Sequence, residues 1–164
     1  MYLKFKNCSG FTLIEILASM FIIIMLTTLL LVNYHSTNKR SKLINAAQQV
    51  ASDIRLAQSY TLGSKKFGGS VPAGGWGIRF VQPNFVQFFA DTQPGAITNL
   101  LYYKNFTLPE GISLKSNDVS IVFEPPDPTV YIEGGASNVI IELTDGETDK
   151  SIEVNSLGLV DVVY

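Results

Sequence analysis

The chain has 164 residues, of which 46% are hydrophobic and 16% are charged, and its formal net charge is −2 at pH 7. This length holds one modest domain in addition to a membrane segment. From Phe106 onward there are eleven acidic and two basic residues. Such an acidic surface repels phosphate backbones, so it disfavours non-specific binding of nucleic acid.

The first element is an apolar run of 22 residues from Phe11 to Val32. As a helix it would be about 33 Å long, enough to cross a hydrocarbon core of about 30 Å. We therefore expect residues 11–32 to form a transmembrane helix. Its single ionisable residue is Glu15, and a carboxylate in a membrane span costs about 2.5 to 3.5 kcal/mol on insertion scales. Glu15 therefore either reaches the headgroup region or has a partner.

The residues around Glu15 resemble the processing site of type IV pilins and of the pseudopilins of type II secretion and DNA-uptake systems. The likeness rests on a short basic leader that ends in Gly10, followed by Phe-Thr-Leu-Ile-Glu at the start of the apolar helix. It implies that residues 1–10 are a prepilin leader peptide. It also implies that a prepilin peptidase cuts between Gly10 and Phe11 and N-methylates Phe11.

The resemblance also implies that Glu15 acts in assembly. After cleavage, the amine of Phe11 is a positive charge about one helical turn from Glu15. An acid and an amine on neighbouring subunits can pair, because a close ion pair is far stronger in low dielectric than in water. The further partners implied are other pilin or pseudopilin subunits, an inner-membrane assembly platform and membrane lipid.

The orientation of the span is also taken from the resemblance. Lysines flank both of its ends, at Lys4 and Lys6 before it and at Lys39 and Lys42 after it, so the positive-inside count does not decide. The resemblance places the leader in the cytoplasm and the following domain outside the cytoplasmic membrane. It then implies a cell-surface or periplasmic filament.

Few side chains are candidates for catalysis or metal binding. The only cysteine, Cys8, would leave with the leader, which removes disulfides, zinc–thiolate sites and a cysteine nucleophile. The single histidine, His35, follows the span, where an interfacial role is typical. Nothing arranges a nucleophile with a base, so we expect no enzyme activity, no metal site and no cofactor. Calcium at the acidic turn 145–149 stays an alternative, although this turn lacks the length and the closing glutamate of an EF-hand loop.

Residues 33–62 are expected to continue the helix. They contain a mostly apolar stripe at alternating spacings of four and three, and no proline occurs between Phe11 and Leu62. Gly63 is expected to end the helix. A single helix of about 50 residues is the favoured interpretation, and two helices with a break between 33 and 38 are the alternative. The stripe residues are Leu43, Ala47, Val50, Ile54, Ala57 and Thr61.

Residues 63–164 are expected to form a β-rich globular domain outside the cytoplasmic membrane. Short β-branched and aromatic runs alternate there with turn residues. Turns at 82–84 and at 145–149 each join two of these runs into a hairpin. The expected strands are 77–81, 85–90, 101–106, 112–114, 120–123, 139–143, 151–154 and 159–163.

Together these elements predict an α+β fold in which a long N-terminal helix packs on an antiparallel sheet. Several stretches, among them Gly-Trp-Gly-Ile-Arg-Phe at 75–80 after Gly74 and Leu-Pro-Glu-Gly-Ile at 108–112, resemble the H-type pseudopilin and FimT-like minor pilin group. The function implied is that of a minor pilin or pseudopilin, a structural subunit of a type IV pilus or a type II secretion-like filament.

Two alternatives remain from the sequence. The first is a single-pass anchored domain that binds an extracytoplasmic ligand and does not polymerise. The second is a DNA-uptake subunit, in which Lys65, Lys66 and Arg79 contact phosphates while Phe67 and Trp76 stack on bases. Three charges give little affinity at physiological salt, so the sequence disfavours nucleic acid as a partner.

Overall fold

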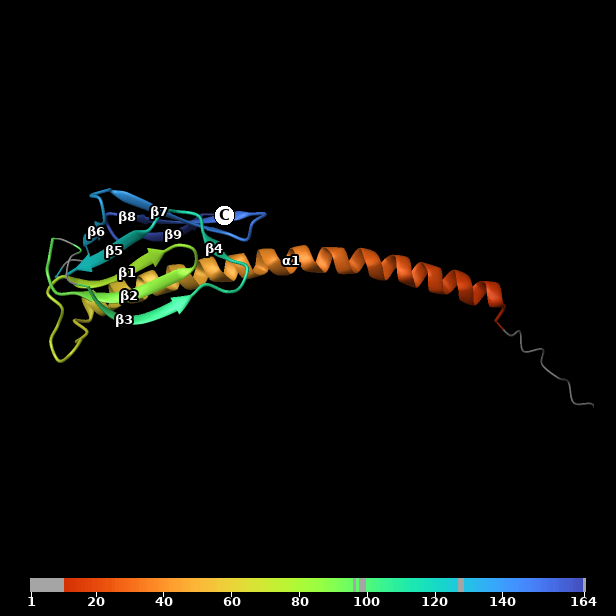
Figure 1. Cartoon of the computed structure of the whole chain (residues 1–164), viewed down its shortest axis with the longest axis horizontal. Coiled ribbons are helices and arrows are strands. Elements are labelled where there is room, and N and C mark those ends of the chain that lie inside the picture. Colours follow the sequence, from red (N-terminus) through yellow and green to blue (C-terminus); the bar gives the residue numbers. More distant parts are fainter. Residues whose placement is uncertain (1–10, 96, 98–99, 127–128, 164) are drawn as a thin grey trace, which may run out of the picture. The chain divides into compact units, whose positions relative to one another are not determined.

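The computed structural model describes residues 11–95, 97, 100–126 and 129–163, and gives only the backbone for residues 31–37. In these residues the chain forms one long helix followed by nine strands (Figure 1), which confirms the expected α+β class. The leader 1–10, with Gly10 and Cys8, and the side chain of His35 lie outside the described residues. The chain divides into two compact units, residues 1–38 and 39–164.

Helix α1 spans Leu13–Leu62, a length of 50 residues. It begins where the carbonyl of Thr12 accepts hydrogen bonds from the N–H groups of Glu15 and Ile16, at 3.1 and 3.3 Å. The helix is continuous through 33–38, because the chain offers no proline that would remove a backbone donor there. The favoured interpretation of one helix is therefore confirmed, and the alternative of two helices is wrong.

The C-terminus of α1 differs in detail from the expectation. The helix ends at Leu62, but the residue in the left-handed conformation is Ser64, with φ 49°, and not Gly63. The N–H of Ser64 donates to Thr61 O at 3.0 Å, and the N–H of Lys65 donates to Tyr60 O at 2.9 Å. This pair of bonds is a Schellman motif, which satisfies carbonyls that the helix end would otherwise leave free.

The second unit contains two antiparallel sheets. Figure 1 shows both along the C-terminal half of α1. The five-stranded sheet has the order β3 (Leu100–Thr107), β2 (Phe85–Asp91), β1 (Gly75–Val81), β5 (Val119–Glu124) and β6 (Thr129–Ile132). The four-stranded sheet has the order β4 (Ser113–Leu114), β7 (Asn138–Thr144), β8 (Asp149–Asn155) and β9 (Val160–Val163).

The expected strands are all present, each with ends shifted by one or two residues at most, but two features were not predicted. Strand β6 was missed because it is short and follows the proline-rich stretch 125–128, which indicates a loop. The strands also divide between two sheets where the sequence analysis expected one. Strand periodicity marks a buried face but does not say which strands share hydrogen bonds.

A single hydrophobic core joins α1 to both sheets. The predicted helical stripe is buried over its whole length, because its side chains cover the inner faces of β1, β2 and β5 on one side and of β7 and β8 on the other. The largest fully buried side chains include Trp76, Phe80, Phe123, Ile141 and Ile152. This core holds β3 and β9, which are edge strands of their sheets, alongside α1.

Candidate functional site

The predicted processing site lies at the start of α1. Gly10 is outside the described residues, so the structure places only its C-terminal neighbour, Phe11, which is 79% exposed and lies two residues before the helix begins. Glu15 is exposed in the first helical turn, and its carbonyl accepts a hydrogen bond from Ser19 Oγ at 2.7 Å. Phe11 and Glu15 therefore flank one turn of backbone at the helix N-terminus.

The helical segment that follows is apolar on all sides. Residues Leu13–Leu30 have a mean hydropathy of 2.5, and none of them is buried within the described chain. This stretch is long and apolar enough to cross a membrane, which fits a membrane anchor near the N-terminus. The hydroxyls of Thr27 and Thr28 are satisfied within the helix, since they donate to the carbonyls of Ile23 and Ile24 at 2.7 and 2.8 Å. The segment can therefore enter an apolar environment without free hydroxyl groups at these positions.

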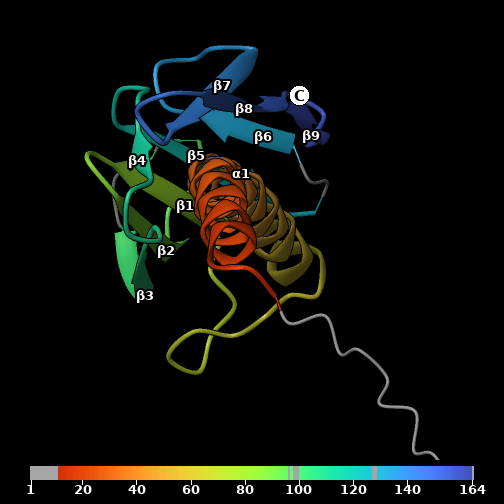
Figure 2. The same cartoon turned by 90° about the vertical axis from the view of Figure 1, so that its right-hand side faces the viewer.

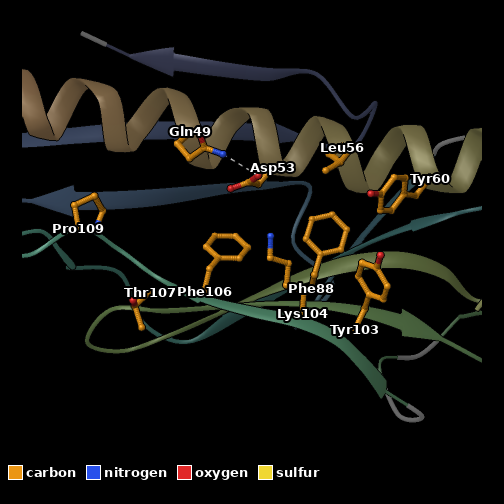
Figure 3. A pocket seen from close by; sticks show the side chains of 10 residues that line it. All are labelled: Gln49, Asp53, Leu56, Tyr60, Phe88, Tyr103, Lys104, Phe106, Thr107 and Pro109. Atoms are coloured by element: carbon orange, nitrogen blue, oxygen red, sulfur yellow. Dashed lines mark hydrogen bonds between the residues drawn. The ribbon is translucent and has the colours of Figure 1, made fainter.

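The second unit carries an open groove between α1 and β3, which the sequence analysis did not predict (Figure 3). Two adjoining cavities of about 400 and 260 Å³ share Gln49, Phe106, Thr107 and Pro109 and so form one groove. We call it the α1–β3 groove. The helix supplies one wall and β3 with the segment after it supplies the other. Its remaining lining residues are Asn45, Ala46, Val50, Asp53, Leu56, Tyr60, Phe88, Tyr103, Lys104 and Leu108.

An irregularity in β3 shapes this groove. Phe88 pairs with Lys104 and Phe89 pairs with Tyr102, so that Tyr103 is an extra residue in β3. A bulge of this kind re-aims side chains, and here both Tyr103 and Lys104 point toward α1 (Figure 3). The sequence alone gave no sign of the groove, because the bulge and the distance between α1 and β3 are tertiary features.

The groove contains one acid and one amine between apolar walls. Gln49 donates a hydrogen bond to the carboxylate of Asp53 at 3.1 Å. Burial raises the pKa of Asp53 above its ordinary value, while the bond from Gln49 and the positive charge of Lys104 oppose this rise. A perturbed acid in a concave apolar surface is typical of binding sites, which makes the groove a candidate binding surface.

Aromatic residues close one end of the groove. The Trp76 ring is only 1% exposed, and it packs edge-on against Tyr60, Phe67 and Tyr103 with ring centroids 5.3, 5.9 and 5.4 Å away. A buried ring cannot stack on a base, so the predicted role of Trp76 in the DNA-contact alternative is wrong. The amine of Lys65 is likewise engaged, since it lies 3.4 Å from the Tyr60 ring centroid.

The acidic turn between β7 and β8 uses its carboxylates within the chain. Asp145 Oδ1 accepts hydrogen bonds from the N–H groups of Glu147 and Thr148 at 2.9 and 2.7 Å, and these bonds lower the pKa of Asp145. Glu147 pairs with Lys39 at 2.7 Å, and Asp149 pairs with Lys115. Among the residues that the structure describes, no three potential metal-ligand side chains cluster. The hydrogen bonds and ion pairs of the turn stabilise it as a hairpin.

Fold and site together define an α+β domain on a long helix whose exposed N-terminal part fits a membrane anchor. Residues 5–31 match the prokaryotic N-terminal methylation motif. This motif is the signal of type IV pilin-like and pseudopilin-like substrates of prepilin peptidase, and it includes Gly10, Phe11 and Glu15. No curated protein and no solved structure matches the chain.

Proposed function

We propose that the chain is a non-enzymatic filament subunit, a minor pilin or pseudopilin of a type IV pilus or a type II secretion-like machine. The observation that carries this proposal is the methylation motif at residues 5–31. The motif includes the apolar helical segment Leu13–Leu30, whose surface is exposed. The same surface would contact lipid before assembly and the helices of other subunits in the filament. The likeness of the β-domain stretches to H-type pseudopilins supports a minor role.

In this function the residues of the N-terminal site act in processing and in assembly. Prepilin peptidase cuts between Gly10 and Phe11 and methylates Phe11, and the globular domain lies outside the cytoplasmic membrane. The carboxylate of Glu15 pairs with the amine of Phe11 on a neighbouring subunit, because both groups would otherwise lie uncompensated among apolar helices. An assembly platform in the inner membrane would then extract the subunit into the filament.

The mass of the N-terminal peptide tests the processing step. Protein expressed with prepilin peptidase should begin at a methylated Phe11, and protein expressed without the enzyme should retain Met1. A chain that begins at Met1 in both cases contradicts the proposal. That result would favour an anchored ligand-binding domain, for which the open α1–β3 groove, with a larger cavity of about 400 Å³, is a suitable site.

The role of Glu15 is tested separately from cleavage. Glu15→Gln should leave processing at Phe11 largely intact and should strongly reduce the amount of subunit recovered in sheared filaments. Ser19→Ala is the matched control, because Ser19 lies one turn further along the same helix and is also exposed. Normal incorporation of the Glu15→Gln subunit would rule out the pairing with the Phe11 amine.

A further inference from the structure

Three cations lie on α1 shortly after the apolar segment. Lys39, Arg40 and Lys42 are all exposed. They are the only lysines and arginines in the helical stretch 16–52, and this stretch contains no acidic residue. Leu43 is fully buried, so the three cations lie where the helix enters the core of the globular domain. We call them the juxtamembrane cations.

The structure pairs one of these cations with an acid. The ammonium of Lys39 lies 2.7 Å from the carboxylate of Glu147 in the turn between β7 and β8. Figure 2, which looks along α1, shows β7 and β8 on one side of the helix. Arg40 is about 100° from Lys39 in one direction around the helix, and Lys42 is about 60° from it in the other. Neither Arg40 nor Lys42 contacts a carboxylate in the part of the chain that the structure describes.

The charges around the juxtamembrane cations leave a small positive excess. The β7–β8 turn places two carboxylates, Asp145 and Glu147, against the three cations. Next to them, two further cations balance two further carboxylates: Lys115 and Lys150 with Glu142 and Asp149. By contrast, residues 39–164 as a whole hold all but two of the 12 basic residues and all but one of the 14 acidic residues, a balance of −3. An anionic membrane surface repels such a domain, so the local positive excess next to the span favours contact there.

Their position along the helix brings Arg40 and Lys42 within reach of lipid headgroups. They follow Val32, the last residue of the apolar run, by eight and ten residues, which is about 12 and 15 Å along a helix. The headgroup layer on each side of a bilayer is about 5 to 8 Å thick. Side chains on a helix lean toward its N-terminus, which is here the membrane side. The long stems of arginine and lysine can therefore bring their charges back to the lipid phosphates.

We propose that Arg40 and Lys42 bind the phosphates of anionic lipid headgroups on the outer face of the cytoplasmic membrane, and that Glu147 withholds Lys39 from the same lipids. The guanidinium of Arg40 can donate two parallel hydrogen bonds to one phosphate, whereas the ammonium of Lys42 acts as a point charge. The contact fixes the depth of the subunit in the membrane and has to break when the subunit leaves it. The proposal rests on the function proposed above, in which the globular domain lies outside the cytoplasmic membrane.

Lipid selection in nanodiscs tests the contact. The full chain, with Lys4→Gln and Lys6→Gln so that the leader does not contribute, is placed in nanodiscs of equal parts phosphatidylglycerol and phosphatidylcholine. Native mass spectrometry then gives the ratio of the two lipids that stay bound to the chain. Each cation near an anionic surface contributes about fivefold in affinity, so phosphatidylglycerol should be enriched. Arg40→Gln with Lys42→Gln should lower the lipid ratio by at least about fivefold, and an unchanged ratio would overturn the proposal.

A matched control separates this contact from general charge attraction. Lys66→Gln with Lys104→Gln removes the same number of charges from two other exposed positions of the domain. This pair of substitutions should leave the lipid ratio unchanged, because neither lysine is close to the span in the chain. A fall in the ratio equal to that of Arg40→Gln with Lys42→Gln would overturn the proposal.

Glu147→Gln tests the part assigned to the ion pair. The substitution frees Lys39, so the lipid ratio should rise by up to about fivefold. Asp161→Asn is the matched control, because it removes a carboxylate at an exposed position of β9 that lies near Arg55 instead of Lys39. A ratio that Glu147→Gln leaves unchanged, or that both substitutions raise equally, would overturn the role of Glu147.

Inorganic phosphate distinguishes a lipid from a soluble anion. Phosphate that replaces chloride at constant ionic strength should leave the lipid ratio unchanged, because the membrane holds its lipids next to the cations at high effective concentration. A ratio that falls to the value of Arg40→Gln with Lys42→Gln would assign the site to soluble anions and overturn the proposal.

Failure of this inference can be told from failure of the proposed function, because the nanodisc measurement needs neither processing nor filaments. A chain that is processed to Phe11 and assembled but selects no phosphatidylglycerol would refute the lipid contact alone. A chain that selects phosphatidylglycerol but keeps Met1 in the presence of prepilin peptidase would support the contact and refute the filament function.

Discussion

Lys65 and Tyr60 contact each other twice at the end of α1. The backbone N–H of Lys65 donates to Tyr60 O at 2.9 Å, and the ammonium of Lys65 lies 3.4 Å from the centroid of the Tyr60 ring. A Schellman motif usually includes an apolar contact between these two positions. Here a cation–π contact takes its place, and the same ammonium lies 4.8 Å from the Tyr103 ring. The helix end is thereby joined to β3 beside the groove.

Loss of this cation should weaken the domain modestly. Lys65→Met keeps most of the alkyl chain but removes the charge, and we expect the free energy of unfolding to fall by about 0.5 to 1 kcal/mol. Lys65→Arg is the control, since a guanidinium also binds aromatic faces. Trp76 is the single tryptophan, so its fluorescence during urea unfolding of the chain in detergent reports on this domain. An equal fall in the free energy of unfolding for Lys65→Met and Lys65→Arg would show that the charge contributes nothing.

The same contact predicts a pH dependence. A bond with Tyr60 raises the pKa of Lys65 above its ordinary value of 10.5. Because the folded state holds this proton more tightly, the contribution is complete below pH 10.5 and declines as the pH rises through the higher pKa of the folded state. The difference between the original chain and Lys65→Met should therefore be constant near neutral pH and should shrink in strong alkali.

Ser64→Gly should stabilise the protein. Ser64 has a φ of 49°, and a left-handed conformation costs a residue with a Cβ about 1 kcal/mol. Glycine avoids this cost, although it gains entropy in the unfolded chain, so we expect a net gain of up to about 1 kcal/mol. Ser52→Gly is the matched control on the exposed face of α1, where the same substitution should cost about 0.5 to 1 kcal/mol. A melting temperature that rises with Ser64→Gly and falls with Ser52→Gly would confirm the left-handed conformation at the helix end.

Thr61 joins α1 to β1 and β5. Its Oγ1 accepts a hydrogen bond from the N–H of Trp76 and donates one to Phe123 O, both at 3.0 Å, and the residue is buried. Thr61→Val has nearly the same shape but leaves both backbone groups unpaired, which should cost about 1 to 3 kcal/mol. Thr61→Ser keeps the hydroxyl and should lose less. A valine variant as stable as the serine variant in urea unfolding would contradict this account.

Asp53→Asn should stabilise the domain near neutral pH. Burial raises the pKa of Asp53 in the folded state, so its carboxylate opposes folding at pH values above that pKa. The ionised Asp53 therefore lowers the free energy of unfolding, whereas a carboxylate paired with a cation usually raises it. The reason is that the folded state binds the proton of Asp53 more tightly than the unfolded state does. The gain from Asn should therefore disappear as the pH falls toward 3.8, the ordinary value for this group. Urea unfolding of both proteins at neutral pH and near pH 3.8 measures the stability gain of Asp53→Asn. A gain that persists at the lower pH would exclude burial as the cause.

Local sequence was sufficient to predict α1 and every described strand except β6. An apolar run with one carboxylate, a stripe with spacings of three and four, and the absence of proline predict helix α1, because each depends on residues close together in the chain. The hairpin turns at 82–84 and 145–149 are likewise local, and the strands on either side of them are confirmed. The motif at residues 5–31 was also recognised from its own residues.

The tertiary structure decided what the sequence could not. The division into two sheets and the pairing of β6 with β5 depend on contacts between residues far apart in the chain. The α1–β3 groove exists because a bulge at Tyr103 turns two side chains toward α1, and no local pattern encodes that register shift. Burial of Trp76 likewise follows from four aromatic neighbours on three different elements and a loop. Local residues thus set the helix and the strands, while packing between distant segments set which surfaces remain open to a partner.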